Sequence, residues 1–216
     1  YCHNPETWER EGGYEATAQE IFRQAWRYRP YWKQTGGITV SGGEPLLQLA
    51  FVTELFRIAK VKGVNTVIDT AGEPFTYDEP FFSAFEELLP LTDLFLLDLK
   101  QIDDVKHRTL TGVSNESALA LARFLSERGK RMWIRHVLVP GWTTGEDDLR
   151  RLSDFIASLK TVDRVEVLPY HAMALHKYEE LHLPYRLGDT PAPTAEEIAR
   201  AEEILRVGEY RGYLKK

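Results

Sequence analysis

The stretch Ile38-Thr39-Val40-Ser41-Gly42-Gly43-Glu44-Pro45 links an apolar strand to a helix that we expect from about residue 46 to residue 62. Two adjacent glycines let the backbone approach a ligand closely and adopt dihedral angles that other residues avoid. Glu44 lies near the helix N-terminus, where the helix dipole favours a carboxylate, and Pro45 fits the first helical turn because its missing N–H needs no partner there. These features predict a rigid turn that grips a small ligand carrying an ammonium group. A purely structural strand-to-helix turn is an alternative of similar weight, because many such turns contain Gly-Gly.

Strand-like runs alternate with helical patterns along the whole chain. This alternation is typical of a parallel sheet covered by helices, and therefore of an α/β fold. Right-handed crossovers permit either an open doubly wound sheet or a barrel, and composition does not choose between them. The run 93–99 is nearly all apolar, which predicts a strand buried on both faces. We expect strands at residues 37–41, 65–70, 93–99, 131–139 and 164–168, and helices at residues 17–28 (opened by a capping box), 46–62, 78–89, 116–128, 147–159 and after 194.

Composition excludes several classes of protein. The 216 residues are 43% hydrophobic, which is enough for one substantial core and predicts a single domain spanning residues 1–216. A net charge of -6 lacks the basic footprint of a nucleic-acid-binding protein. The sequence has no apolar run long enough to span a bilayer, and its one cysteine excludes an intramolecular disulfide framework. We therefore expect a soluble cytoplasmic protein that binds neither nucleic acid nor membrane.

Polar side chains gather where the expected strands end. In parallel barrels, functional residues lie at the C-terminal ends of the strands. Each group alone has a structural explanation: a simple turn for Asp69-Thr70, a solvated strand end for Asp98, and a satisfied loop histidine for His171. Several strand ends that converge on one face favour a binding site instead. The residues concerned are Ser41 to Glu44, Asp69, Thr70, Asp98, Lys100, Tyr170 and His171, with Arg135 inside its strand.

The chain begins Tyr1-Cys2-His3-Asn4-Pro5, and Cys2 is its only cysteine. A lone cysteine is most often a small buried apolar residue. Here, however, the segment lies upstream of Ser41-Gly42-Gly43-Glu44-Pro45. This pairing resembles the radical S-adenosylmethionine enzymes and, within them, the pyruvate formate-lyase-activating enzymes.

The resemblance implies a cluster ligand and a fold. In that family three cysteines spaced C-x3-C-x2-C hold a 4Fe–4S cluster, and Cys2 matches the third of them, preceded by the aromatic Tyr1. One thiolate does not hold such a cluster, so we expect the chain to be a fragment of a longer protein and to be inactive by itself. The implied fold is a partial (β/α)6 barrel of the radical S-adenosylmethionine type, with its first βα unit missing. The likeness covers nearly all of the chain and becomes vague after about residue 185.

The resemblance also implies roles for individual residues. Cys2 and Lys100 match catalytic positions. Asp69, Thr70 and Asp98 resemble a site for a monovalent cation, which would offset repulsion between packed carboxylates. The alternative for Asp69 is stabilisation by backbone donors alone, and the alternative for Arg135 is an ion pair inside the barrel. The residues implied to contact S-adenosylmethionine are Tyr1, Cys2, His3, Gly42, Gly43, Glu44, Asp98, Leu99, Lys100, Arg135 and His171.

The implied chemistry is reductive cleavage of S-adenosylmethionine at the cluster, which gives a 5′-deoxyadenosyl radical that takes hydrogen from a glycine of pyruvate formate-lyase. The implied partners are that enzyme and a flavodoxin- or ferredoxin-type electron donor. Residues 5–16 contain no cysteine, which favours the single-cluster type over relatives with an inserted ferredoxin-like segment. Three alternatives stay open: an activase of another glycyl-radical enzyme, a radical enzyme acting on a small molecule, and a cluster-free barrel that binds a nucleotide or a partner protein.

Overall fold

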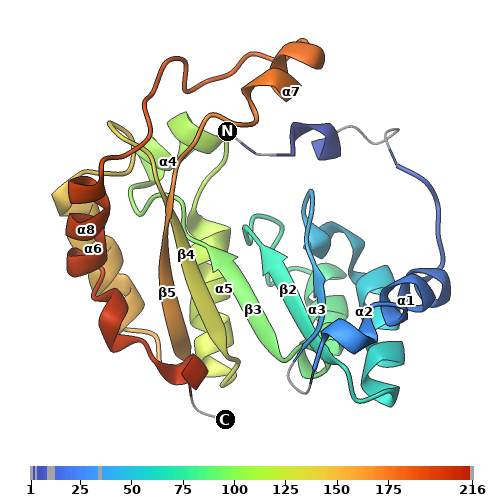
Figure 1. The fold of residues 1–216 in the computed structure, drawn as a ribbon. Coiled ribbons are helices and arrows are strands. Elements are labelled where there is room, and N and C mark those ends of the chain that lie inside the picture. Colours follow the sequence, from blue (N-terminus) through green and yellow to red (C-terminus); the bar gives the residue numbers. More distant parts are fainter. Residues whose placement is uncertain (1, 3, 9–12, 34–35, 215–216) are drawn as a thin grey trace.

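The computed structural model describes residues 2, 4–8, 13–33 and 36–214. These residues contain one five-stranded parallel sheet (Figure 1). Its strand order follows the sequence: β1 (Gly37–Val40), β2 (Asn65–Thr70), β3 (Leu94–Asp98), β4 (Met132–Leu138) and β5 (Val162–Pro169). Doubly wound sheets reverse their strand order part-way across. The sequential order is instead that of a barrel wall, which confirms the predicted partial barrel and decides the alternative that composition leaves open.

Most of the helices lie along one face of this sheet, whereas α7 lies above the strand ends (Figure 1). One row of strand side chains, for example Ile68 and Leu97, is buried beneath them, whereas the alternate row, for example Val67 and Leu96, is half-buried. We call the half-buried side the inner face. The expectation that residues 93–99 are buried on both faces is therefore wrong, because among the described residues only the outer face packs against helices. The helices are α1 (Ala18–Trp26), α2 (Leu49–Val61), α3 (Phe81–Leu88), α4 (Asp104–Thr111), α5 (Glu116–Glu127), α6 (Glu146–Ala157), α7 (Leu175–Glu180) and α8 (Ala195–Ile204).

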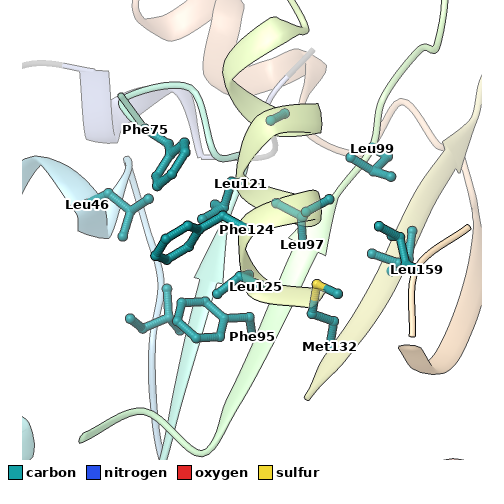
Figure 2. Close-up of a cluster of buried hydrophobic side chains, with 14 of the residues drawn as sticks. Leu46, Phe75, Phe95, Leu97, Leu99, Leu121, Phe124, Leu125, Met132 and Leu159 are labelled. Atoms are coloured by element: carbon teal, nitrogen blue, oxygen red, sulfur yellow. The ribbon is translucent and has the colours of Figure 1, made fainter. Parts of the chain in front are cut away.

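A cluster of aromatic and aliphatic side chains fills the space between the sheet and α5 (Figure 2). Phe85 is completely buried there, and its ring centroid lies 5.4 Å from that of Phe75, 6.0 Å from that of Phe124 and 6.2 Å from that of Phe95. Such offset and edge-on aromatic pairs add to the stabilisation that burial of apolar surface provides. The packing fixes β3 relative to its neighbours and so fixes where the strand ends lie.

Helix boundaries follow local sequence signals in most places. The predicted capping box is confirmed, since the Thr17 side chain accepts from the Glu20 N–H while the Glu20 carboxylate accepts from the Thr17 N–H. The helix expected at 46–62 begins instead with a 3-10 turn, Pro45–Gln48, before α2. Sequence reasoning missed α4 and α7. Both are short, and α4 buries only His107 and Leu110, so neither carries a strong apolar period.

Among the described residues, no helix has the length and apolar character needed to cross a membrane.

Replacing Phe85 with alanine should lower the free energy of unfolding by about 4 kcal/mol, because it removes a fully buried ring and leaves a cavity among four other rings, that of Phe81 included. Urea denaturation followed by circular dichroism measures this loss. Leu47→Ala is the matched control, since Leu47 is 73% exposed and its truncation should change stability by less than about 0.5 kcal/mol. Equal effects of the two substitutions would contradict the assignment of this cluster as the core.

Candidate functional site at the carboxyl ends of the strands

All strands of the parallel sheet end at the same edge, which lies at the top of Figure 1. The turn after β1 carries the two glycines of the motif, with φ of +82° at Gly42 and +51° at Gly43. These backbone conformations favour glycine and confirm that the turn requires it. A Cβ atom built on Gly42 would have no other described atom within 4 Å, so the backbone of this turn is open to a ligand.

Glu44 caps the helical turn that follows and ties two strand ends together. Its carboxylate accepts hydrogen bonds from the Leu46 N–H at 3.0 Å, the Thr70 hydroxyl at 2.6 Å and the Ala71 N–H at 3.0 Å. Burial raises the pKa of Glu44, and the Thr70 hydroxyl and the two N–H groups oppose that shift. The carboxylate thus joins the turn after β1 to the loop after β2, a contact that the sequence does not reveal.

Arg135 bridges two aspartates on the inner face of the sheet. Its Nε donates to Asp98 Oδ1 at 2.8 Å, its Nη1 donates to Asp69 Oδ2 at 3.0 Å, and its Nη2 contacts Asp69 Oδ1 and, at 2.7 Å, Asp98 Oδ1. The strand register explains the cluster, because Asp98 lies directly opposite Arg135 and Asp69 lies opposite Leu96 on the intervening strand. The ion pair that sequence reasoning offers as the alternative for Arg135 is therefore present.

Burial and ion pairing shift the pKa values of Asp98 and Arg135 in opposite directions. Burial raises the pKa of Asp98, while Arg135 and then Lys100 lower it. Burial lowers the pKa of Arg135, but Asp98 and Asp69 outweigh it, so the pKa of this guanidinium is raised. The side chains of Arg135, Asp69 and Asp98 are 18%, 23% and 21% exposed, so the cluster keeps access to solvent and to a ligand.

The other residues predicted on the strand ends lie around these two groups. Leu99 is buried, and its carbonyl oxygen lies 2.8 Å from Nδ1 of His136. Lys100 is half-buried directly after it, and His171 is exposed beyond the end of β5. Gly43 approaches the N-terminal segment, because a Cβ built on it would lie 3.6 Å from the Thr7 carbonyl oxygen.

Cys2 is half-buried above the strand ends, in a segment that sequence reasoning does not place. Its Sγ accepts a hydrogen bond from the Asn4 N–H at 3.3 Å, and its carbonyl oxygen accepts from the Tyr178 hydroxyl at 3.1 Å. Two neighbouring predicted site residues, Tyr1 and His3, lie outside the described residues. No motif in the sequence marks Tyr178 as a partner of Cys2.

The predicted cation ligands do not converge. Asp69 and Asp98 face the guanidinium of Arg135, whereas the Thr70 hydroxyl donates to Glu44. In the described part of the chain, no group of three or more histidine, cysteine, aspartate or glutamate side chains is arranged to hold a metal ion. The guanidinium already supplies the positive charge that the two aspartates require.

Two cavities elsewhere contain none of the predicted site residues. One of about 200 Å³ lies beside β5, and one of about 330 Å³ lies between α6 and α8. The chemically distinctive groups, Glu44 and the Arg135 cluster, lie instead at the strand ends. We therefore place the candidate site at the strand ends.

Comparison with known proteins shows the family of this chain. Residues 1–156 match the family described as the radical SAM superfamily. A pyruvate formate-lyase-activating enzyme from Streptococcus mutans is 44% identical over 218 residues, which cover 100% of this chain and 83% of that protein. One from Staphylococcus aureus is 46% identical over 203 residues, which cover 93% of this chain and 81% of that protein. The chain belongs to the radical SAM superfamily, among the pyruvate formate-lyase-activating enzymes.

Solved structures support the same family. A domain of a pyruvate-formate lyase-activating enzyme from Bacteroides vulgatus superposes with a TM-score of 0.65 at 25% identity, over 81% of this chain and 96% of that one. A radical SAM methyltransferase from Sphaerobacter thermophilus gives the same TM-score at 20% identity, over 91% of this chain and 56% of that one, and supports the fold alone. The resemblance drawn from the sequence is confirmed.

The residues of this chain fit the two groups that the family implies, to different extents. The open Gly42-Gly43 backbone and the charged cluster around Arg135 fit a polar ligand such as S-adenosylmethionine, whose amino acid moiety carries both charges. The Asn4 N–H on Cys2 Sγ is the kind of contact that sulfur ligands of iron–sulfur clusters receive. Cys2 fits as one ligand, while a 4Fe–4S cluster needs further thiolates that the 216 residues do not contain.

Replacing Arg135 with methionine should lower the free energy of unfolding by about 2 kcal/mol at pH 7, because two partly buried carboxylates lose their counter-charge. Burial already raises the pKa of Asp98, and loss of the guanidinium, which opposes that shift, raises it further. The variant's penalty is thus small when Asp98 is protonated, and it grows as pH rises through the raised pKa of this carboxyl group. Urea denaturation of parent and variant at pH 4 and pH 7 measures the difference.

The control for Arg135→Met is Arg57→Met, which removes an ion pair with Glu87. The side chains of Arg57 and Glu87 are 58% and 65% exposed. Exposed pairs contribute little, so this substitution should leave stability nearly unchanged at both pH values. A penalty of Arg135→Met that does not depend on pH would show that lost packing, and not the charge pair, explains the effect.

Proposed function

We propose that this chain is the catalytic part of an enzyme that uses S-adenosylmethionine and a 4Fe–4S cluster to install a glycyl radical on pyruvate formate-lyase. The observation that carries the proposal is the open Gly42-Gly43 turn at the strand ends, which lies against the segment that contains Cys2. Relatives at 43–46% identity bear the name of the activity. The 216 residues would act as one domain.

In this proposal the residues divide between two groups. Cys2 is a ligand of the cluster, with Tyr1 and His3 beside it. The Gly42-Gly43 backbone, with Glu44 behind it, receives the amino group of S-adenosylmethionine. Further contacts to that molecule come from Asp98, Leu99, Lys100, Arg135 and His171. When bound, the reduced cluster and S-adenosylmethionine supply the chemistry of reductive carbon–sulfur cleavage and of hydrogen abstraction.

The chain's own contribution is placement and charge. Glu44 is held by three donors, so it fixes the turn and leaves the backbone groups of the glycines for the ligand. Arg135 and Lys100 offer positive charge to a carboxylate, and Asp69 and Asp98 keep the guanidinium in place until a ligand arrives. Such preorganised charges act without rearranging solvent at the moment of reaction.

Partners follow from the same proposal. The glycine enters on a loop of pyruvate formate-lyase, so the strand ends face a protein, and a flavodoxin- or ferredoxin-type protein supplies the electron.

A monovalent cation at Asp69, Thr70 and Asp98 belongs to the proposal too. Its binding requires these side chains to turn away from Arg135 and Glu44, so potassium should shift the melting temperature only when S-adenosylmethionine is present.

Replacing Gly43 with valine in a chain extended by the other two cysteines of the family's C-x3-C-x2-C motif, and reconstituted with iron and sulfide, should weaken S-adenosylmethionine binding at least about tenfold, because a branched side chain blocks close backbone approach. Isothermal titration measures the affinity. Gly63→Val is the matched control: Gly63 also has positive φ, at +67°, and open surroundings, but it lies in the turn before β2, at the opposite edge of the sheet. Both variants place a β-branched residue at a positive φ, so equal losses of binding would overturn the cofactor assignment of the turn.

Replacing Asp98 with asparagine should lower the glycyl-radical yield on pyruvate formate-lyase at least about tenfold, while the free energy of unfolding falls by only about 1 kcal/mol. Asparagine keeps an oxygen that accepts from Arg135 but removes the charge. Electron paramagnetic resonance of the partner measures the yield beside a denaturation curve, with Cys2→Ala as the variant that abolishes it.

The matched control is Asp163→Asn, which alters another aspartate paired with an arginine, Arg131, at the other edge of the sheet. It should keep the full radical yield. Full yield from Asp98→Asn as well would mean that the acidic strand ends are structural.

A further inference from the structure

Helix α7 lies above the strand ends, beside the N-terminal segment (Figure 1). It has only six residues, and no motif of the sequence falls on it. Two consecutive side chains, Lys177 and Tyr178, contact the described residues of the segment 2–8, which is more than 160 positions away in the sequence. We call this set of contacts the α7 clasp.

Lys177 contacts the segment on the carboxyl side of the cysteine. Its ammonium group donates to Asn4 Oδ1 at 3.1 Å and to Glu6 Oε1 at 2.7 Å. The hydrogen bond from Lys177 lowers the pKa of Glu6, so this carboxylate is ionised at neutral pH. Asn4 is also the residue whose N–H donates to Cys2 Sγ, so Lys177 holds the residue that contacts the sulfur.

Tyr178 contacts the cysteine itself. Its hydroxyl donates to the Cys2 carbonyl oxygen at 3.1 Å, and its ring meets the Trp8 ring edge-on at 5.9 Å. The Tyr178 side chain is 2% exposed, and burial raises its pKa to about 12, so the hydroxyl keeps its proton. The segment 2–8 is thus held at both ends by one side chain.

The clasp is anchored to the sheet through two more tyrosines. The Tyr178 ring packs edge-on against that of Tyr185 at 4.8 Å, and the Tyr185 hydroxyl lies 2.6 Å from the hydroxyl of Tyr170. Tyr170 is 1% exposed and follows β5 directly. A continuous line of contacts therefore runs from the end of β5 to the backbone of Cys2.

We propose that Lys177 and Tyr178 are positioning residues that hold the Cys2 segment over the strand ends in the orientation needed for cluster ligation. The inference rests on the proposed function, in which Cys2 is a cluster ligand. The polar contacts of the clasp fall on Cys2, Asn4 and Glu6, on either side of the sulfur's own hydrogen-bond donor. Loss of the clasp should release the thiol without unfolding the barrel.

Thiol accessibility tests this without iron or S-adenosylmethionine. In the 216-residue chain, alkylation of Cys2 by iodoacetamide is read by peptide mass spectrometry. Tyr178→Phe and Lys177→Gln should each raise the rate about fivefold or more, because each removes a hydrogen bond that opposes local opening. Tyr31→Phe and Lys62→Gln, the same changes at exposed positions, should leave the rate unchanged.

Two further measurements separate positioning from general stability. The charge-swapped pair Glu6→Lys with Lys177→Glu restores an ion pair of opposite sense and should bring the labelling rate back toward that of the parent. Lys177→Gln should keep the melting temperature of the parent, since the Lys177 side chain is 30% exposed and makes polar contacts with the segment. This variant decides the matter if Tyr178→Phe proves unstable.

Parent labelling rates in Lys177→Gln, or rates that rise only in proportion to global unfolding, would overturn the inference. Such a result leaves the proposed function intact, because the radical assay with Cys2→Ala tests that separately. Faster labelling in a protein that forms no cluster when full-length would support the clasp and refute the proposed function.

Discussion

The inner face of the sheet depends on one guanidinium held between two carboxylates. Three adjacent strands, β2, β3 and β4, each contribute one charged side chain to this cluster, and the register of the sheet places them side by side. A sheet face without helices above it would expose apolar rows to water or collapse on itself. Paired charges keep it open and polar instead, because ionised groups retain solvent where apolar groups exclude it. Arg135 therefore keeps charged, partly exposed groups on the face where we propose that a ligand binds.

Glu44 is the second group that fixes the strand ends, and its hydrogen bonds change the interpretation of the Gly-Gly-Glu motif. The sequence predicts a rigid turn whose fixed carboxylate helps to grip a ligand, and the carboxylate here accepts from three donors of its own chain. A buried carboxylate needs such donors, since an unpaired one would be neutralised by protonation. Because these donors occupy the Glu44 carboxylate, the backbone groups of Gly42 and Gly43 are left to bind a ligand. The Thr70 hydroxyl, which resembles a cation ligand in sequence, is one of these donors.

Sequence reasoning succeeded where a signal is local. The Thr17 capping box, the glycines with positive φ and the five parallel strands each follow from a few neighbouring residues. It failed where partners are distant in the sequence or the apolar period is weak. The Glu44–Thr70 bond joins residues 26 positions apart, and the Tyr178–Cys2 bond joins residues 176 positions apart. Family resemblance named residues of the strand ends but gave no information on α7, because a six-residue helix carries no periodic pattern.

The shortness of α7 has a thermodynamic consequence for the site. An isolated helix of six residues is unstable in water, since nucleation is unfavourable and few hydrogen bonds follow it. Its order must come from packing through Tyr178 and from contacts with the segment 2–8, while that segment takes its order from α7. The two are then mutually stabilising, and whatever binds the Cys2 thiolate shifts the equilibrium of both by its differential affinity for the ordered state. In the proposed function, cluster binding at Cys2 and the order of residues 175–180 are thereby linked through the same few contacts.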